Sequence, residues 1–434
     1  MILGLGGGAV VAGLGFGVVL TYRASGVVNF GHAAVATFAA FAFHEFRASG
    51  DIVLPVVAVP HRVHLLDRPT VATGLVVLVA YAAALGWLLH RLVFRPLRRA
   101  TPLGRVVASV GVFLYFWAVI GVTWPTTPDT RPVLPTSNIT VFGRLLGVDR
   151  LLLAALASVL AGVLWLLGHR TQFGRATTAA NDNPRGAVLR GIDPDRLAAL
   201  SWVLAVVLGS LVVVAGSRVI PLDPLNNSLL VVPALAAALL GNFQSYPLVL
   251  AASLGLGMVQ SELLNLQTDT SWLPNIGLQQ GIPFLVIVIV MVARGKGLPV
   301  RGDAGTGRLP AAPAPKHVAA VTATLSAIAV VALLTGGSDT RAAIITSTTF
   351  AMLALSVVTL TGFVGQISFA TYAIAGCAAF ALVKFADAGL PFPVAPILAV
   401  ATAWVVGWVV GLPATRVRGL SLAVVTLAAA VAIS

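Results

Sequence analysis

Residues 197–216 read LAALSWVLAVVLGSLVVVAG, without a single charged side chain. A helix needs about 20 predominantly apolar residues to cross the hydrocarbon layer of a bilayer. Similar runs recur along the whole chain, and they are continuously apolar rather than alternating, which favours helices over barrel strands. The sequence therefore predicts an all-α polytopic membrane protein with about 14 transmembrane or half-membrane segments. We expect them near residues 1–20, 27–43, 70–90, 106–122, 151–168, 197–216, 228–241, 246–263, 281–293, 318–335, 343–360, 367–383, 393–411 and 419–434.

Composition excludes the main alternatives. Only 9% of the 434 residues are charged, 58% are hydrophobic, and the mean hydropathy is +0.97. A soluble domain carries about 25% charged residues, and a disordered chain lacks hydrophobic residues. The net charge of +13 lies in short loops between apolar runs. That placement indicates orientation in a membrane rather than binding of nucleic acid.

The basic loops predict the orientation. Three loops, at residues 91–105, 169–196 and 294–317, carry five Lys or Arg each. Alternation of the spans places all three on one side, provided that residues 228–263 form a hairpin whose tip lies on that same side. Because basic residues concentrate on the cytoplasmic side, we expect these loops inside and the N-terminus in the extracytoplasmic space.

A change of composition predicts a division of the chain. Residues 294–317 are rich in Gly, Pro and basic residues, and LPAAPAP at 309–315 is typical of an extended spacer. We therefore expect two membrane parts, at residues 1–293 and 318–434, with a cytoplasmic linker between them. An ordinary cytoplasmic loop remains the alternative, because composition alone does not separate the two.

An internal repeat supports this division. A shift of 339 residues places Gly26 on Gly365 and Phe30 on Phe369. In each half, a span is followed by a short turn that contains glycine, then by a cluster of polar residues and another span. Parallel halves of this kind are common in transporters, with the pathway between them. Polar groups buried in a membrane are costly and often functional. Candidate pathway residues are therefore Asn29, Phe30, His32, Gln366 and Ser368; the alternative is that they cap helices or bridge neighbouring ones.

Several segments carry a resemblance to a known family. They are SGVVNFGH at 25–32, FRPLR at 94–98, RTQFGR at 170–175, GID at 191–193, RGKGL at 294–298, GFVGQISF at 362–369 and LPATRVRGL at 412–420. In this order they resemble the permease subunits of ABC importers for branched-chain amino acids. Residues 1–300 resemble the LivH type, and residues from 318 onward resemble the LivM type. The two types are usually separate chains, and a LivM-type subunit would continue beyond Ser434, so the resemblance implies a fusion with a truncated second half.

The resemblance assigns a role to the loop at 169–196, which would hold the coupling helix that docks on the ATPase. The residue types suit a short helix: Asp182 or Asn183 can cap its start, Pro184 fits its first turn and Gly191 fits just past its end. The alternative is a solvated basic loop. The candidate coupling residues are Asp182, Asn183, Pro184, Arg185, Ala187, Val188, Leu189, Gly191 and Ile192.

The resemblance implies the permease component of an ABC importer in the cytoplasmic membrane. Its partners would be ABC ATPase subunits and an extracytoplasmic substrate-binding protein, and its substrate a branched-chain amino acid. Urea or short amides, which the wider family also carries, remain open. An ion-coupled secondary transporter is the alternative from another class, although ionisable residues are scarce in the spans. We find no phosphate-binding loop and no metal motif, so we predict no catalytic residue, metal or cofactor, and no ATP hydrolysis by this chain.

Overall fold

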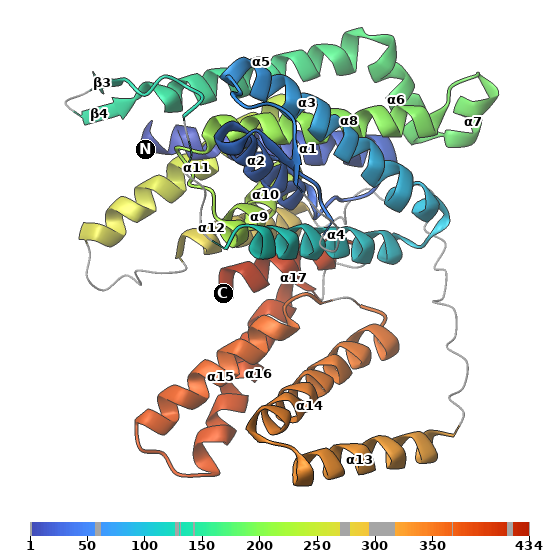
Figure 1. The fold of residues 1–434 in the computed structure, drawn as a ribbon, viewed down its shortest axis with the longest axis vertical. Helices are drawn as coiled ribbons and strands as arrows, with labels where there is room; N and C mark the ends of the chain where they lie inside the picture. Colours follow the sequence, from blue (N-terminus) through green and yellow to red (C-terminus); the bar gives the residue numbers. More distant parts are fainter. Residues whose placement is uncertain are drawn as a thin grey trace.

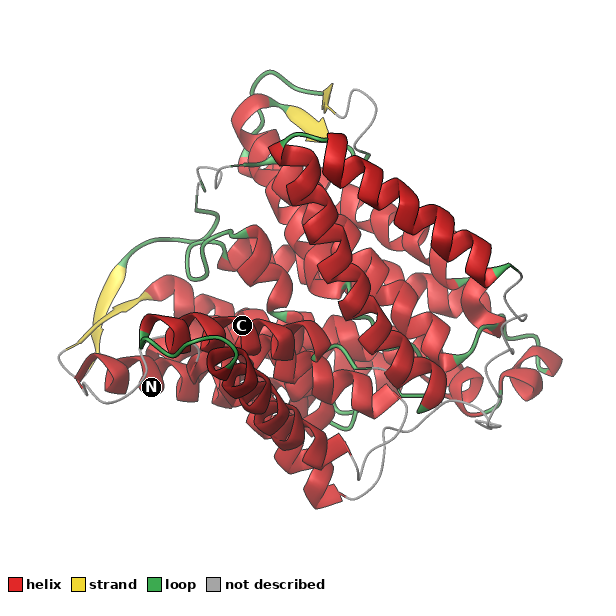
Figure 2. Ribbon diagram, turned by 90° about the horizontal axis from the view of Figure 1, so that it is seen from below, coloured by secondary structure: helices red, strands yellow, loops and turns green. Residues whose placement is uncertain are grey.

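Helices make up nearly all of the structure. The computed structural model describes residues 2–56, 62–125, 130, 132–141, 144–269, 278–294, 317–366, 368–414 and 420–433. Two short strand pairs project from the edges of the helical body (Figure 2). The α-helices are α1 Leu5–Ser25, α2 His32–Ser49, α3 Val71–Leu88, α4 Pro102–Thr123, α5 Val148–Arg170, α6 Gln172–Asp182, α7 Pro184–Leu189, α8 Pro194–Gly216, α9 Pro224–Leu229, α10 Val231–Leu240, α11 Tyr246–Asp269, α12 Leu278–Arg294, α13 Val318–Thr335, α14 Ser338–Val358, α15 Thr371–Asp387, α16 Val394–Ala414 and α17 Leu420–Ile433.

The remaining elements extend or connect these helices. A 3-10 turn, η1 (Ile2–Gly4), precedes α1, and a π-helical turn, η2 (Leu89–Phe94), continues α3 into the 3-10 turn η3 (Pro96–Arg99). A second π-helical turn, η4 (Thr359–Phe363), ends α14. The antiparallel pairs are β1 (Asp51–Val53) with β2 (Arg62–His64), and β3 (Asn138–Val141) with β4 (Arg144–Gly147).

The predicted fold class is confirmed. Each of the fourteen apolar runs falls on helical structure, and within the described ranges nine helices are long and apolar enough to cross a membrane. The run at 228–241 is divided between α9 and α10. The turn at 241–245 joins α10 to α11, and the two helices pack together as the predicted hairpin.

Helix α1 forms the centre of the first part, and α5, α8, α10 and α11 pack around it. Its glycines permit this close packing. A Cβ added to Gly8 would lie 2.7 Å from the carbonyl oxygen of Ser253 in α11, and one added to Gly13 would lie 2.6 Å from the side chain of Val212 in α8. Small residues let helix backbones approach closely, which is how helices associate in lipid.

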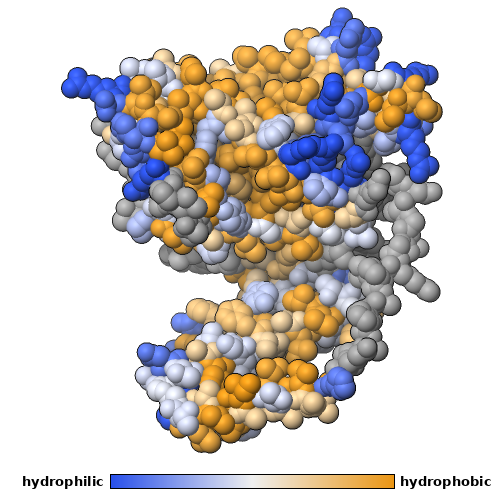
Figure 3. Space-filling model, turned by 45° about the vertical axis from the view of Figure 1, so that its right-hand side comes forward, coloured by the Kyte–Doolittle hydropathy of each residue, from blue (hydrophilic) through white to orange (hydrophobic). Residues whose placement is uncertain are grey.

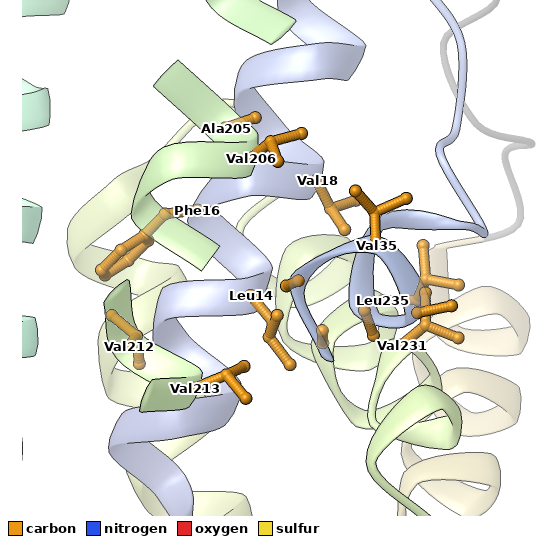
Figure 4. Packing of buried hydrophobic residues seen from close by; sticks show 14 of the residues in the cluster. Leu14, Phe16, Val18, Val35, Ala205, Val206, Val212, Val213, Val231 and Leu235 are labelled. Atoms are coloured by element: carbon orange, nitrogen blue, oxygen red, sulfur yellow. The ribbon is translucent and has the colours of Figure 1, made fainter. Parts of the chain in front are cut away.

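Buried side chains of four helices meet at this centre (Figure 4). Leu14 of α1 lies between Val213 of α8 and Leu235 of α10, with Val35 of α2 on the same side as Leu235, whereas Phe16 of α1 points to the other side, toward α8. All five side chains are buried. This cluster packs α1 against α2, α8 and α10.

The second part is packed far more loosely. Helices α13 to α16 extend away from the α1-centred body (Figure 1). Among the described residues of α13 and α14, none is buried. Contact with the first part runs mainly through α17, which packs on α12, and through a small cluster of Ala370, Val410 and Ala429 with Phe284 beside it.

Polarity divides the first part into two ends and a middle. In Figure 3, apolar side chains cover the middle of the upper body, and hydrophilic residues lie along its left and right sides. The N-terminus and the β3–β4 pair lie at one end of α1, whereas α7 lies at the other (Figure 1). An apolar belt between two polar ends is the distribution that a bilayer requires.

The turns before α2 and α15 each begin with a glycine in the same backbone conformation. Gly26 and Gly365 both adopt a left-handed conformation, with φ of 66° and 68°. Helix α2 then begins at His32 and α15 at Thr371, the same number of residues after each glycine. In both turns a hydroxyl from a later helix meets the backbone. Ser109 of α4 donates to the carbonyl of Val28 (3.3 Å), and Thr426 of α17 accepts from the amide of Phe369 (3.1 Å).

Candidate functional site

The loop at 169–196 holds two helices, α6 and α7, rather than the single short helix that the sequence suggested. Helix α6 begins where Thr171 accepts a hydrogen bond from the amide of Gly174 (3.3 Å). Arg23, at the end of α1, donates to the hydroxyl of Thr178 (3.3 Å). Side chains Thr177 and Ala180 are buried. The underside of α6 is therefore fastened to the body of the protein, and α6 carries α7 outward.

Helix α7 has the start that its residue types predict. The Asn183 side chain accepts a hydrogen bond from the amide of Gly186 (2.9 Å), and Pro184 occupies the first turn. An amide oxygen at this position satisfies a backbone donor that the helix leaves open, and proline is pre-organised for the first turn. Of the two predicted caps, Asn183 is the one used. Asp182 is instead the last residue of α6, and its side chain lies outside the described residues.

The end of α7 is equally well defined. Gly191 adopts a left-handed conformation with φ of 77°. Its amide donates to the carbonyl of Val188 (2.9 Å), and the amide of Ile192 donates to that of Ala187 (3.0 Å). These two bonds form the Schellman motif, which closes a helix by using carbonyls that would otherwise lack partners. A six-residue helix is thus held at both ends.

The surface of α7 is apolar at its tip. Ala187 is buried against the protein, whereas the side chains of Val188 and Leu189 are exposed, at 58% and 88%. Arg185 and Arg190 are exposed beside them. This polar end of the molecule lies outside the apolar belt, so a solvent-exposed leucine is costly there. The arrangement suits a partner with an apolar groove and an acidic rim.

The polar turn before α2 lies deeper than the inner end of a span, where the sequence placed it. Asn29 and His32 are buried. The imidazole of His32 is wedged between Gly17 of α1 and Gly209 of α8, where an added Cβ would contact its Nε2. Gly17 precedes the end of α1 by eight residues, or about 12 Å of helix. The ring nitrogens of His32 and Oδ1 of Asn29 have no hydrogen-bond partner among the described residues.

The corresponding residues before α15 are less buried. The backbone amide of Gln366 donates to the carbonyl of Leu360 (3.1 Å), and the Ser368 hydroxyl accepts from the backbone amide of Ala370 (3.3 Å). The structure brings the two turns together through aromatic rings, because Phe30 and Phe369 lie 6.2 Å apart between centroids. Phe369 was absent from the candidate list. Its position opposite Phe30 in the repeat was the signal that pointed to it.

Groups suited to a metal are not found in the part of the chain that the structure describes, where no three His, Cys, Asp or Glu side chains gather. Exposed apolar and cationic groups lie at α7, and buried amide, imidazole and hydroxyl groups lie at the turns.

The first part of the chain is similar to known transport proteins. Residues 1–291 match the family described as branched-chain amino acid transport system / permease component. The chain is 23% identical over 268 residues to the high-affinity branched-chain amino acid transport system permease protein BraD of Pseudomonas aeruginosa; the match covers 60% of this chain and 84% of BraD. It is 22% identical over 305 residues to LivH, the permease protein of the same transport system in Escherichia coli, covering 67% of this chain and 91% of LivH. No solved structure matches.

Proposed function

Since the chain belongs to the family of branched-chain amino acid transport permease components, we propose that it forms the membrane pathway of an ABC importer in the cytoplasmic membrane. A separate ATPase subunit would supply the energy, and an extracytoplasmic binding protein would deliver the substrate. The family match covers residues 1–291, and α13 to α17 would supply the second wall of the pathway.

Helix α7 is the observation that carries the proposal. It presents Val188 and Leu189 to solvent at the polar end of the body, with Arg185 and Arg190 on either side. Both ends of α7 are held by hydrogen bonds, so it presents this surface without an ordering cost on binding. We infer that the surface inserts into a groove of the ATPase, with Leu189 as the central anchor.

The orientation follows from this assignment. If α7 meets an ATPase it lies in the cytoplasm, and the loop at 91–105 lies there as well, since Asp195 pairs with Arg98. The N-terminus, at the opposite end of α1, then lies in the extracytoplasmic space together with the β3–β4 pair. This agrees with the concentration of basic residues on the inner side.

We propose further that residues 1–293 and 318–434 are related halves, and that the substrate passes between them. Three observations support this: the same left-handed glycine before α2 and α15, the same spacing to the helix start, and the contact of Phe30 with Phe369. Asn29, His32, Gln366 and Ser368 would then lie along the pathway. For BraD and LivH the transported class is given as branched-chain amino acids, and we extend that class to this chain.

Replacing Leu189 tests the docking surface. The variant Leu189→Asp places a charge where an apolar anchor is proposed, and an unpaired buried charge costs enough to weaken binding by at least about tenfold. The matched control is Leu145→Asp in β4, which is 69% exposed at the opposite end. ATPase subunits should co-purify with the control and with the unchanged protein, but not with Leu189→Asp. Equal retention in all three would reject the assignment of α7.

Uptake into proteoliposomes tests the transport function. The complete gene product is reconstituted with its ATPase and binding protein, and labelled leucine, valine and urea are offered in turn. Uptake of leucine or valine that requires both ATP and the binding protein is the expected result. Uptake of urea alone would move the substrate class to amides. Uptake driven by a proton gradient without ATP would identify an ion-coupled transporter instead.

A further inference from the structure

Three helix ends meet at the cytoplasmic side of the first part. Asp195, in the first turn of α8, accepts from Arg98 of η3 at 2.6 Å, and Nε of Arg95 lies 3.4 Å from the same carboxylate oxygen. Arg105 at the start of α4 donates to the carbonyl oxygens of Leu97 (3.2 Å) and Arg98 (2.6 Å). The side chain of Arg98 is thus held by α8, and its backbone by α4.

Aromatic packing strengthens the same corner. Phe94, at the end of η2, stacks on Trp202 of α8 with ring centroids 4.1 Å apart, and both side chains are buried. Gly86 of α3 lies against the backbone of Trp202, so an added Cβ would be 2.8 Å from its carbonyl oxygen. The end of α3 therefore packs tightly on α8. The ion pairs of Asp195 extend this packed corner to η3, and the hydrogen bonds of Arg105 extend it to α4.

Helix α8 also follows directly after α7. Only residues 190–193 separate the two helices, and Asp193 caps α8 by accepting from the amides of Asp195 (3.0 Å) and Arg196 (3.3 Å). Further along, Gly209 of α8 touches His32, and Ser109 of α4 donates to the carbonyl of Val28. Both helices that meet at Arg98 thus reach the buried turn before α2.

We propose that Asp195 is a positioning residue for energy coupling. Its pairs with Arg98 and Arg95 make the corner between α3 and α4 move together with α8 when the ATPase displaces α7. The proposal rests on the proposed docking of the ATPase at α7. The ion pairs are partly exposed, so they add little to stability. Their consequence is geometric, because without them α8 would tilt while α4 and the turn beside Ser109 stay in place.

The experiment compares two substitutions at the corner with one beside it. Asp195→Asn and Arg98→Gln each break the bridge between α8 and η3. Arg196→Gln is the matched control, since Arg196 pairs with Asp193 (3.2 Å), the residue that caps α8, and joins no second element in the described part of the chain. Asp195→Glu keeps the carboxylate. For each variant, reconstituted with ATPase and binding protein, we measure ATPase retention, ATP turnover and leucine uptake.

The expected result is a change in coupling alone. Asp195→Asn and Arg98→Gln should retain the ATPase and hydrolyse ATP, but the leucine taken up per ATP should fall by at least about fivefold. Arg196→Gln and Asp195→Glu should remain close to the unchanged protein. Because ATPase retention is measured separately, failure of the docking assignment appears in Leu189→Asp and not in this ratio.

Two outcomes would overturn the proposal. If uptake per ATP is the same in Asp195→Asn as in Arg196→Gln, the bridge transmits nothing. If Asp195→Asn or Arg98→Gln loses the ATPase, the corner acts by holding α7 in place rather than by moving α4. Elution of each variant as a monodisperse peak confirms that a loss of coupling is not a loss of fold.

Discussion

Helices α1 and α14 are each 21 residues long, and both belong to segments apolar enough to cross a membrane, yet they differ in packing. Most residues of α1 are buried, whereas none of the described residues of α14 is. Six glycines lie in α1, at positions 6, 7, 8, 13, 15 and 17, and α14 has none. Both segments are hydrophobic enough to enter the membrane, but only α1 carries the glycines that let other helices pack closely around it.

The physical reason lies in the solvent. Lipid tails are as apolar as leucine, so burying a hydrophobic side chain against another helix gains little over leaving it in lipid. Association depends instead on close packing, which Gly8 and Gly13 permit at α11 and α8. The exposed aromatic residues of the second part, such as Phe363 and Trp404, carry no penalty in a bilayer. The following predictions test the contrast between the two parts.

The largest effect is expected for tryptophan. Trp202 is fully buried against Phe94, whereas Trp404 of α16 is 71% exposed. Trp202→Ala leaves a cavity and should lower the free energy of unfolding by about 3–5 kcal/mol. Trp404→Ala should change it by less than about 0.5 kcal/mol. Unfolding in mixed micelles measures both, and equal losses would contradict the contrast in packing.

Enlarging a glycine should have the next largest effect. In Gly8→Leu the side chain meets the backbone of α11, so overpacking should cost about 1–3 kcal/mol and reduce the yield of folded protein. Gly376→Leu in α15 is the control, because no described atom lies within 4 Å of an added Cβ. Monodisperse protein recovered from equal amounts of membrane is the measurement. A tolerated leucine at position 8 would show that α1 is not closely packed.

A smaller effect should connect the two parts. A double-mutant cycle of Phe30→Ala and Phe369→Ala should give a coupling energy of about 0.5–1.5 kcal/mol, as expected for an aromatic pair in contact. Phe16 and Tyr246, 6.1 Å apart within the first part, provide the reference cycle. If the effects of Phe30→Ala and Phe369→Ala are additive while the reference pair shows coupling, Phe30 and Phe369 are not in contact and do not link the two parts.

The smallest effect concerns pH. Hydrogen bonds to Asp51 (2.7 Å) and Asp67 (3.0 Å) raise the pKa of His64 above its ordinary value. Because the folded-state pKa is raised, protonated His64 stabilises the folded β1–β2 pair. This stabilisation is fully present below the unfolded pKa of about 6.5 and is lost as pH rises through the folded pKa.

Hydrogen exchange measures this change. After correction for the intrinsic exchange rate, protection of the β1–β2 pair should decrease slightly between pH 5.5 and 8.5. His64→Gln should remove the dependence on pH, and the turn at 388–393 in the second part, which has no histidine, should not show it. A pH dependence that survives in His64→Gln would assign it to another group.

Much of the fold follows from local rules. Each apolar run became helical structure. Asn183 and Pro184 mark the start of α7 and Gly191 follows its end, because capping depends on residues a few positions apart. The division of the loop at 169–196 into two helices was missed. Helix α6 is polar, and its underside is held by Arg23, which lies far away in the sequence.

The sequence by itself determined the membrane class, the positions of the apolar helices, the end of α7 at Gly191 and the match of Phe30 to Phe369, because these depend on composition, spacing or internal similarity. Only the tertiary structure decided that His32 lies between Gly17 and Gly209, that Asp195 pairs with Arg98, and that Phe30 contacts Phe369. Each of these pairs joins residues from different elements. Periodicity and capping rules reach about four residues along a helix, so they do not indicate which helices become neighbours.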